Sequence, residues 1–199
     1  MRTLHVACQP FPSPQGTQAL IGAMLEALRA SGDAPELLAY AHGEGRAPAV
    51  PVHRVPDWPR ARSLRSGPSF AKVALDLRAV AALRALVRRR APALVVAHSV
   101  EAALVARAAR VPNVAYVAHT RFDAELPSYA PARLSAPLEI LGARLDALAV
   151  GAGAVAAVAP SLADALSARF AIEARALPVP WPPAGALPPP IGVEERRAA

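Results

Sequence analysis

The chain has 199 residues, of which 54% are hydrophobic, so it is long enough for one sizeable core and too apolar to be disordered throughout. Its 22 basic and 15 acidic residues give a net charge of +7, which favours anionic partners such as phosphates, nucleotides or an acidic membrane surface. The single cysteine, Cys8, excludes an internal disulfide, and the five histidines show no metal-binding spacing.

Other classes are disfavoured by what the sequence lacks. No motif of interleaved aromatic and basic residues indicates a nucleic-acid partner. The uncharged run over residues 147–163, rich in glycine and alanine, is shorter than the roughly 20 residues that a membrane-spanning helix needs. We therefore expect a cytoplasmic protein, with peripheral contact to the inner face of the membrane as a further option.

The first part of the chain is typical of the start of a βαβ unit. Residues 3–7 predict a buried strand, and a Pro-punctuated loop over residues 9–18 carries Gly16 near its end. Thr17 is expected to cap the helix that follows, which runs to residue 30 with apolar side chains at helical spacing. Two more short strands are predicted at residues 37–40 and 50–55.

The middle of the chain is strongly basic. A loop over residues 57–68 carries Arg60, Arg62 and Arg65, and a helix predicted over residues 69–90 ends in three consecutive arginines. Arginines in a last turn complement the negative end of a helix, and Pro92 prevents its continuation. Both runs are typical of solvated surface, with docking to an acidic membrane as the alternative.

Two neighbouring strands then end in histidine. Residues 93–97 predict a strand that ends at His98, followed by a helix over residues 100–110. Residues 114–118 predict the next strand, which ends at His119. A polar loop follows to residue 129, and its candidate substrate-binding side chains are those of Thr120, Arg121, Asp123 and Glu125.

The last part of the chain repeats the alternation. A helix is expected over residues 134–150, a strand over 154–159, a helix from 160–161 to about 170, and a final strand over 175–179. Residues 1–180 are interpreted as one domain, and residues 181–199 as a Pro-rich interdomain linker or disordered tail.

This alternation predicts an α/β fold, a single Rossmann-like domain with a mostly parallel sheet covered by helices on both faces. In such a sheet ligands bind at the carboxyl ends of the strands. His119 is therefore the leading candidate, against a structural role at a strand end. His98 either lines the cleft or is satisfied locally. Asp123 and Glu125 are acid/base candidates or solvated carboxylates, and Arg121 either binds an anion or pairs with Asp123.

An ordered set of segments extends this interpretation: LHVACQPFPSPQGTQ, VVAHS, VAYVAHTRFDAELP, VAAVAPSLADAL and ALPVP. Together they resemble the N-terminal, acceptor-side domain of a GT-B fold, family-4-type glycosyltransferase, over nearly the whole chain to about residue 190. Only Gly16 stands where that family often has two or three adjacent glycines.

The resemblance implies a retaining, metal-independent, hexosyltransferase-like enzyme that moves a sugar from a nucleotide-diphosphate donor to a hydroxyl of a sugar or lipid-linked acceptor, without a cofactor. It implies a catalytic role for His119 near the transferred sugar, and a donor-binding role for Gly16 and Thr17 at the phosphates. The donor-binding C-terminal domain is expected outside this chain, so the isolated chain is expected to be incomplete and inactive.

Two alternatives stay open. The domain could be a non-catalytic glycan- or protein-binding module derived from the same fold. A nucleotide-dependent epimerase or reductase is the third reading, and it is disfavoured because the first strand-to-helix turn has Gly16 alone and no G-x-G-x-x-G pattern.

Overall fold

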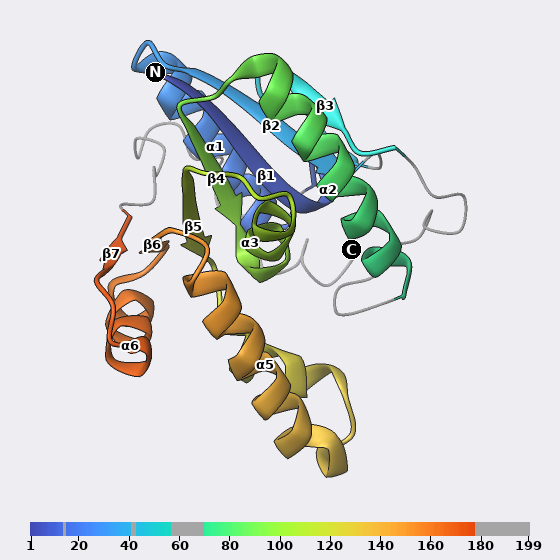
Figure 1. Ribbon diagram of the computed structural model, residues 1–199, viewed down its shortest axis with the longest axis vertical. Coiled ribbons are helices and arrows are strands. Elements are labelled where there is room, and N and C mark those ends of the chain that lie inside the picture. The colour runs from blue at the N-terminus through green and yellow to red at the C-terminus, as the bar shows by residue number, and fades with distance from the viewer. Residues whose placement is uncertain (14, 41–42, 57–69, 178–199) are drawn as a thin grey trace, which may run out of the picture.

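A computed structural model describes residues 1–13, 15–40, 43–56 and 70–177. The described part contains one seven-stranded sheet in the order β3-β2-β1-β4-β5-β6-β7, and every neighbouring pair of strands is parallel (Figure 1). The strands are β1 (Arg2–Pro10), β2 (Ala34–Tyr40), β3 (Val52–Arg54), β4 (Leu94–His98), β5 (Val114–Ala118), β6 (Ala154–Ala157) and β7 (Ala174–Ala176). The predicted α/β class with a parallel sheet is confirmed.

The strand order reverses at β1. The chain builds outward from β1 through β2 to β3, and then crosses back to place β4 on the other side of β1. The connection after β1 therefore runs toward β2, and the connection after β4 runs the opposite way, toward β5. These diverging connections open a crevice at the carboxyl ends of β1 and β4. This is the edge that carries Gln9 and Pro10 of β1 and His98 of β4.

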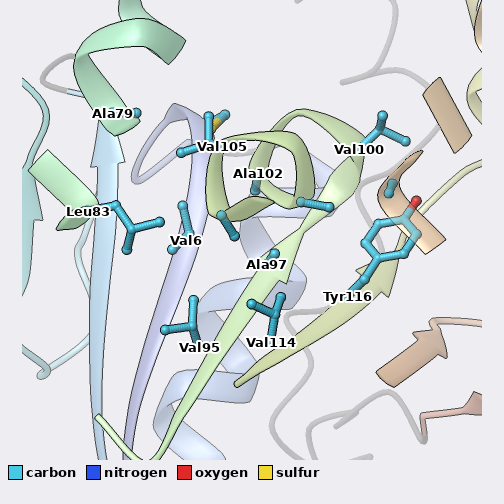
Figure 2. Packing of buried hydrophobic residues seen from close by; sticks show 14 of the residues in the cluster. Val6, Ala79, Leu83, Val95, Ala97, Val100, Ala102, Val105, Val114 and Tyr116 are labelled. Carbon is cyan, nitrogen blue, oxygen red and sulfur yellow. The ribbon is translucent and has the colours of Figure 1, made fainter. Parts of the chain in front are cut away.

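Helices cover both faces of the sheet. Helix α1 (Gly16–Ala30) buries Ile21 and Leu25 on one face, against a small cluster that includes Ala7, Leu37 and Ala39. The larger cluster lies on the opposite face, where α2 (Phe70–Arg90) and α3 (Ser99–Ala108) pack over the centre of the sheet (Figure 2). The remaining long helices are α5 (Ser135–Val150) and α6 (Pro160–Phe170).

Side-chain alternation explains the division between these two clusters. On β1, Leu4, Val6 and Cys8 belong to the larger cluster, whereas Ala7 belongs to the α1 face. His5 follows the same alternation as Ala7, which places it on the α1 face. The strands have buried side chains on both faces, as expected of a parallel sheet.

Two details of the sequence interpretation are wrong. Helix α1 begins at Gly16 with Gln15 as its N-cap residue, so Thr17 lies inside the first turn and does not cap the helix. The segment after β5 is also no irregular loop. It forms the short helix α4 (Phe122–Glu125) and two 3-10 turns, η1 (Leu126–Tyr129) and η2 (Ala132–Leu134), which lead into α5.

Half of the six arginines considered for membrane contact lie outside the described part. Arg60, Arg62 and Arg65 lie there, as does the expected linker over residues 181–199. Arg88, Arg89 and Arg90 form the last turn of α2 and are exposed. Among the helices that the structure describes, none is both long enough and apolar enough to span a bilayer.

Candidate functional site

A pocket of about 250 Å³ lies at the carboxyl ends of β1, β4 and β5, where the strand order reverses. Its walls come from segments far apart in the sequence: the end of β1, the start of α1, the first turns of α2 and α3, and the segment after β5. The lining residues are Cys8, Gln9, Pro10, Ser13, Gln15, Gly16, Thr17, Gln18, Lys72, His98, Ser99, Val100, Glu101, His119, Thr120, Phe122, Glu125 and Tyr129.

The start of α1 forms one wall. Gly16 is exposed at the first helical position, and a Cβ atom built there would have nothing within 4 Å. Its backbone is not in the left-handed region, so neither packing nor conformation requires glycine. The contrast with Gly153 is clear, since a Cβ there would lie 2.0 Å from the carbonyl oxygen of Val114. The missing side chain at Gly16 leaves open access to backbone N–H groups of a helix start, which favour anions.

Three histidines form a line that ends at the pocket. Nδ1 of His5 lies 3.0 Å from Nε2 of His98, and Nδ1 of His98 lies 3.2 Å from Nε2 of His119. The first two rings have centroids 5.2 Å apart and planes inclined by only 19°, so they meet edge to edge through their nitrogens. His5 and His98 are fully buried, and His119 is half-buried in the pocket wall.

Burial keeps this line neutral at physiological pH. It lowers the pKa of His5 and of His119 from 6.5 to about 4 in each case. Burial also lowers the pKa of His98 well below its usual value, and the two neighbouring histidines lower it further. A neutral imidazole carries one N–H and one lone pair, so each ring in the line can both donate and accept.

A carboxylate with two hydroxyl partners forms the opposite wall. Glu125 accepts hydrogen bonds from Thr120 through Oγ1 and from Tyr129 through Oη, the latter at 2.7 Å. The hydrogen bond to Glu125 raises the pKa of Tyr129 to about 12. All three side chains line the pocket, so this wall presents one carboxyl group and two hydroxyl groups.

Sequence reasoning missed Lys72 and Glu101, which contribute opposite charges to the pocket. Burial raises the pKa of Glu101, and the nearby Lys72 ammonium opposes that rise. A signal was available for Lys72, because it is the only lysine among the 22 basic residues of the chain. Glu101 stands two residues after Ser99 in the first turn of α3, and no motif singles it out.

Ser99 lines the pocket directly after His98, the last residue of β4. Its φ is 71°, in the left-handed region that costs a non-glycine residue roughly 1–2 kcal/mol. The turn at Ser99 joins β4 directly to α3, with His98 as the last strand residue. The strained residue thus adjoins the middle histidine of the line, where the chain enters the pocket wall.

A second buried polar cluster lies under the pocket. Tyr40 donates a 2.6 Å hydrogen bond from Oη to Oδ1 of Asp76. Burial raises the pKa of Tyr40, of Asp76 and of Cys8, and the Cys8 thiol also interacts with the Asp76 carboxylate. Only Cys8 of these three reaches the pocket wall. A thiol with a raised pKa is a poor nucleophile, so this cluster offers no reactive cysteine.

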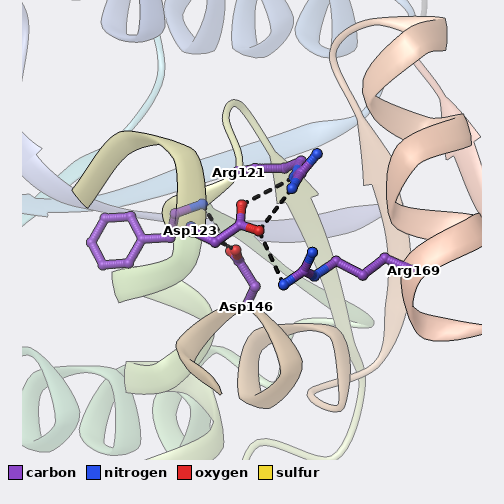
Figure 3. Close-up of polar contacts among 5 residues, drawn as sticks. Arg121, Asp123, Asp146 and Arg169 are labelled. Carbon is purple, nitrogen blue, oxygen red and sulfur yellow. Dashed lines mark hydrogen bonds and ion pairs between the residues drawn. The ribbon is translucent and has the colours of Figure 1, made fainter. Parts of the chain in front are cut away.

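Arg121 and Asp123 do not line the pocket; they form an ion-pair cluster with Arg169, next to the carboxylate of Asp146 (Figure 3). Arg121 donates two hydrogen bonds to the Asp123 carboxylate, at 3.0 and 2.7 Å, and Arg169 approaches the same carboxylate at 3.2 Å. Hydrogen bonding to Arg121 lowers the pKa of Asp123, which is 2% exposed.

Asp146 caps α4 from another helix. Its carboxylate accepts the backbone N–H groups of Phe122 and Asp123, at 3.1 and 3.0 Å. The close approach of α5 to α4 depends on Gly142, where a Cβ would lie 2.6 Å from the Cα of Asp123. These contacts hold the segment after β5 in place and thereby set the position of Thr120 and Glu125.

The predicted site residues therefore separate into two groups. Gly16, Thr17, His98, His119, Thr120 and Glu125 come together in the pocket wall. Arg121 and Asp123 are not among the lining residues; they pair with each other, which was one of the two alternatives for Arg121. Their ion pairs account for both side chains without a ligand.

The pocket offers groups suited to a ligand that carries both negative charge and hydroxyls. The start of α1 and the Lys72 ammonium favour negative charge. Glu101, Glu125 and His119 are hydrogen-bonding groups suited to hydroxyls. Within the described residues, no group of three or more histidine, cysteine or acidic side chains is arranged to hold a metal ion.

Comparisons with known proteins give a family and a fold. The family model described as Glycosyltransferase Family 4 matches residues 14–180. No curated protein matches the sequence. Among solved structures, a sucrose-phosphate synthase from Thermosynechococcus elongatus superimposes with a TM-score of 0.64 at 13% identity, over 88% of this chain and 46% of that one.

A UDP-GlcNAc 2-epimerase from Neisseria meningitidis, bound to UDP-GlcNAc, is also similar, with a TM-score of 0.48 at 13% identity over 88% of this chain and 45% of that one. The chain thus spans about half the length of these structures. At such low identity the likeness to the synthase shows the fold alone.

Proposed function

Because the chain belongs to glycosyltransferase family 4 and has the fold of the N-terminal half of a GT-B enzyme, we propose that its pocket is the acceptor-side half of a sugar-transfer site. The donor in this proposal is a nucleotide-diphosphate sugar, and the acceptor is a hydroxyl of a sugar or of a lipid-linked glycan. Transfer proceeds with retention of the anomeric configuration and without a metal ion.

One observation carries the proposal: the unfilled space at Gly16 and the half-buried His119 line the same pocket. The first feature suits a diphosphate, since backbone N–H groups at a helix start bind phosphate oxygens. The second suits the sugar that the diphosphate carries. A nucleotide sugar is a ligand class that combines both groups in one molecule.

The charged groups of the pocket support an acceptor rich in hydroxyls. Two of its three formally charged side chains are the carboxylates Glu101 and Glu125, and the third is Lys72. Carboxylates accept hydrogen bonds from hydroxyls and repel anions. We therefore assign Glu101, Glu125 and Thr120 to the acceptor, and Gly16, Thr17 and Lys72 to the diphosphate.

The proposed transfer needs no side chain of the protein to take up the acceptor proton. The acceptor oxygen bonds to the anomeric carbon as the bond from that carbon to the diphosphate oxygen breaks, and the acceptor proton passes to the leaving diphosphate. His119 donates a hydrogen bond to a hydroxyl of the transferred sugar or to a phosphate oxygen of the donor, where negative charge grows as the bond breaks. Stabilising the leaving diphosphate requires more positive charge than Lys72 provides.

A second domain is therefore part of the proposal. Lys72 is the only cation among the lining residues, and the chain spans 46% of the synthase it resembles. We assign the remaining donor contacts to a C-terminal GT-B domain, whether it is carried on the same polypeptide or on a partner.

The test is transfer by the protein assembled with its second domain, using UDP- and GDP-sugars as probes. We expect His119→Ala to lower kcat/KM by about 10²-fold, the effect typical of removing one donor aimed at transition-state charge. Undiminished transfer by His119→Ala would remove this residue from the mechanism.

Gly16→Val tests the diphosphate end. Its Cβ would contact nothing in the protein, so the fold is expected to be unchanged while donor binding, measured by calorimetry, is lost. Gly22→Ala is the matched control, because Gly22 lies in the same helix and a Cβ there meets only Phe11, at 3.9 Å. Glycan binding without any donor turnover in the assembled protein would instead support a non-catalytic binding module.

A further inference from the structure

The three histidines occupy a diagonal across three adjacent strands. His5 on β1 is level with Val96 on β4, two residues before His98. His98 in turn is level with Val117 on β5, two residues before His119. Each step therefore moves one strand across and two residues toward the carboxyl edge, and side chains two residues apart share a face. The line runs from the interior of the sheet to the pocket.

Only two proton arrangements satisfy both hydrogen bonds in this line. His98 carries one N–H and one lone pair. If it accepts a hydrogen bond at Nε2 it must donate one at Nδ1, and if it donates at Nε2 it must accept at Nδ1. In the first arrangement His5 donates to His98, His98 donates to His119, and Nδ1 of His119 carries the proton. In the second, every donor and acceptor is exchanged and Nδ1 of His119 is a bare lone pair.

The buried end of the line separates these two arrangements. Nε2 of His5 is buried and has no hydrogen-bond partner among the described residues. The second arrangement would put an N–H at that atom, whereas the first leaves a lone pair there. Unpartnered buried N–H groups are rare in folded proteins, and unpartnered acceptors are less so. The first arrangement is therefore favoured.

We propose that His5 and His98 are positioning residues that hold His119 as its Nδ1–H tautomer, so that His119 presents a hydrogen-bond donor to the pocket. The tautomer itself does not depend on the proposed function. Only the identity of the ligand that accepts this hydrogen bond rests on it. In the part of the chain that the structure describes, Nδ1 of His119 has no hydrogen-bond partner and is left for a ligand.

This arrangement assigns a chemical role to His119. Its Nε2 lone pair is already used by His98, and its Nδ1 already carries a proton, so neither nitrogen is free to accept a proton from a hydroxyl. His119 is thus a neutral donor to a sugar hydroxyl or a phosphate oxygen, and not a general base. The acceptor proton must then leave by another route, which agrees with its transfer to the leaving diphosphate.

The experiment is long-range ¹H–¹⁵N NMR of the full chain with ¹⁵N-labelled histidine, at pH 7 and without ligand. His119→Gln identifies the His119 signals by their disappearance. We expect His119 to show a protonated Nδ1 and an unprotonated Nε2. A histidine free in water favours the opposite tautomer, so a wild-type His119 protonated at Nε2 would overturn the proposal.

A matched pair of variants tests whether His98 does the positioning. The amide nitrogen of asparagine can take the place of Nδ1, so His98→Asn is expected to keep the Nδ1–H form of His119. His98→Leu has a similar size and no donor, and is expected to shift His119 toward the Nε2–H form. An unchanged tautomer in a folded His98→Leu protein would refute the role of His98.

One control and one independent readout complete the design. His53→Gln alters a histidine on β3, outside the line, and is expected to leave the His119 signals unchanged. If His98→Leu does not fold, the wild-type spectrum still decides the direction of the line. Since the spectra need no substrate, failure of this inference is distinguishable from failure of the proposed transfer activity.

Discussion

Two regions of the molecule begin at the same strand end and differ in how completely their polar groups are paired. His119 and Thr120 leave β5 toward the pocket, whereas Arg121 and Asp123, one to four residues further on, turn into the ion-pair cluster. In that cluster the Asp123 carboxylate has two guanidinium partners and the Asp146 carboxylate has two backbone N–H partners. In the pocket, Nδ1 of His119 has no partner among the described residues.

The difference in pairing distinguishes a region that supports the structure from a region that can bind a ligand. A polar cluster whose groups are all paired needs no ligand, while an unpaired donor in a pocket wall gains a partner only when a ligand binds. The ion-pair cluster fixes α4 against α5 and so positions the pocket wall. Each prediction below perturbs one of the two regions and gives the effect expected from how its groups are paired.

The largest effect is expected from Asp146→Ala, which removes the carboxylate that caps α4. The change leaves the N–H groups of Phe122 and Asp123 without their acceptor, and each unsatisfied buried group costs about 1–3 kcal/mol. We expect the free energy of unfolding to fall by roughly 2–5 kcal/mol in urea titrations, with the loss appearing as a lower midpoint.

The control for this prediction is Asp164→Ala, which removes an exposed aspartate from α6. Its effect should stay within about 0.5 kcal/mol, as is usual for surface substitutions. If Asp146→Ala cost no more than its control, the cap on α4 would have no supporting role.

The second effect separates the two regions by pH. The folded pKa of His5 is about 4 against 6.5 when unfolded, so between these values the unfolded chain binds more protons and stability is lost as pH falls. At about 1.4 kcal/mol per pKa unit, His5 accounts for a loss of roughly 3 kcal/mol. The Asp123 pKa is lowered below 3.8, so its contribution is retained in this window and is lost only at lower pH.

His5→Phe removes this titration. Urea unfolding of wild type and variant should be compared from pH 7 to pH 4.5, and the stability advantage of the wild type should shrink as pH falls. Taking the difference between the two proteins cancels Asp76, Glu101 and Asp146, whose raised pKa values act in the opposite sense. Parallel curves would show that His5 is not held neutral.

The smallest effect is expected from Glu125→Gln, on the exposed side of the pocket. Tyr129 is 42% exposed, so losing its bond to the carboxylate should cost less than about 1 kcal/mol. The sharper readout is absorbance titration of the tyrosines, because burial raises the pKa of Tyr40 and Tyr116 and Tyr129 ionises first. Its pKa should fall from about 12 toward 10, and an unchanged value would mean that Glu125 does not hold the hydroxyl.

The fold was predictable because its signals are local. The strand predicted over residues 114–118 matches β5, since an apolar run ends there at a polar residue. Helix α4 was missed because its first turn is capped by Asp146, which lies 23 and 24 residues further along the chain. No local pattern reveals such a cap.

The site was predictable only where its residues follow a strand. His98 and His119 end predicted strands, which placed both at the edge of the sheet before the structure was known. His5 lies inside an apolar strand, and only the register of β1 with β4 connects it to the other histidines. Lys72 and Glu101 reach the pocket from helices whose positions depend on packing across the sheet.

The residue at position 142 can be used to compare this chain with its homologues. Because a Cβ at this position would overlap the backbone of Asp123, a homologue with any larger residue there must carry its post-β5 segment further from α5. Its pocket wall would then be displaced, and it would present Thr120 and Glu125 differently to an acceptor. One position in an alignment can therefore sort relatives by the shape of this wall, even where the histidines are retained.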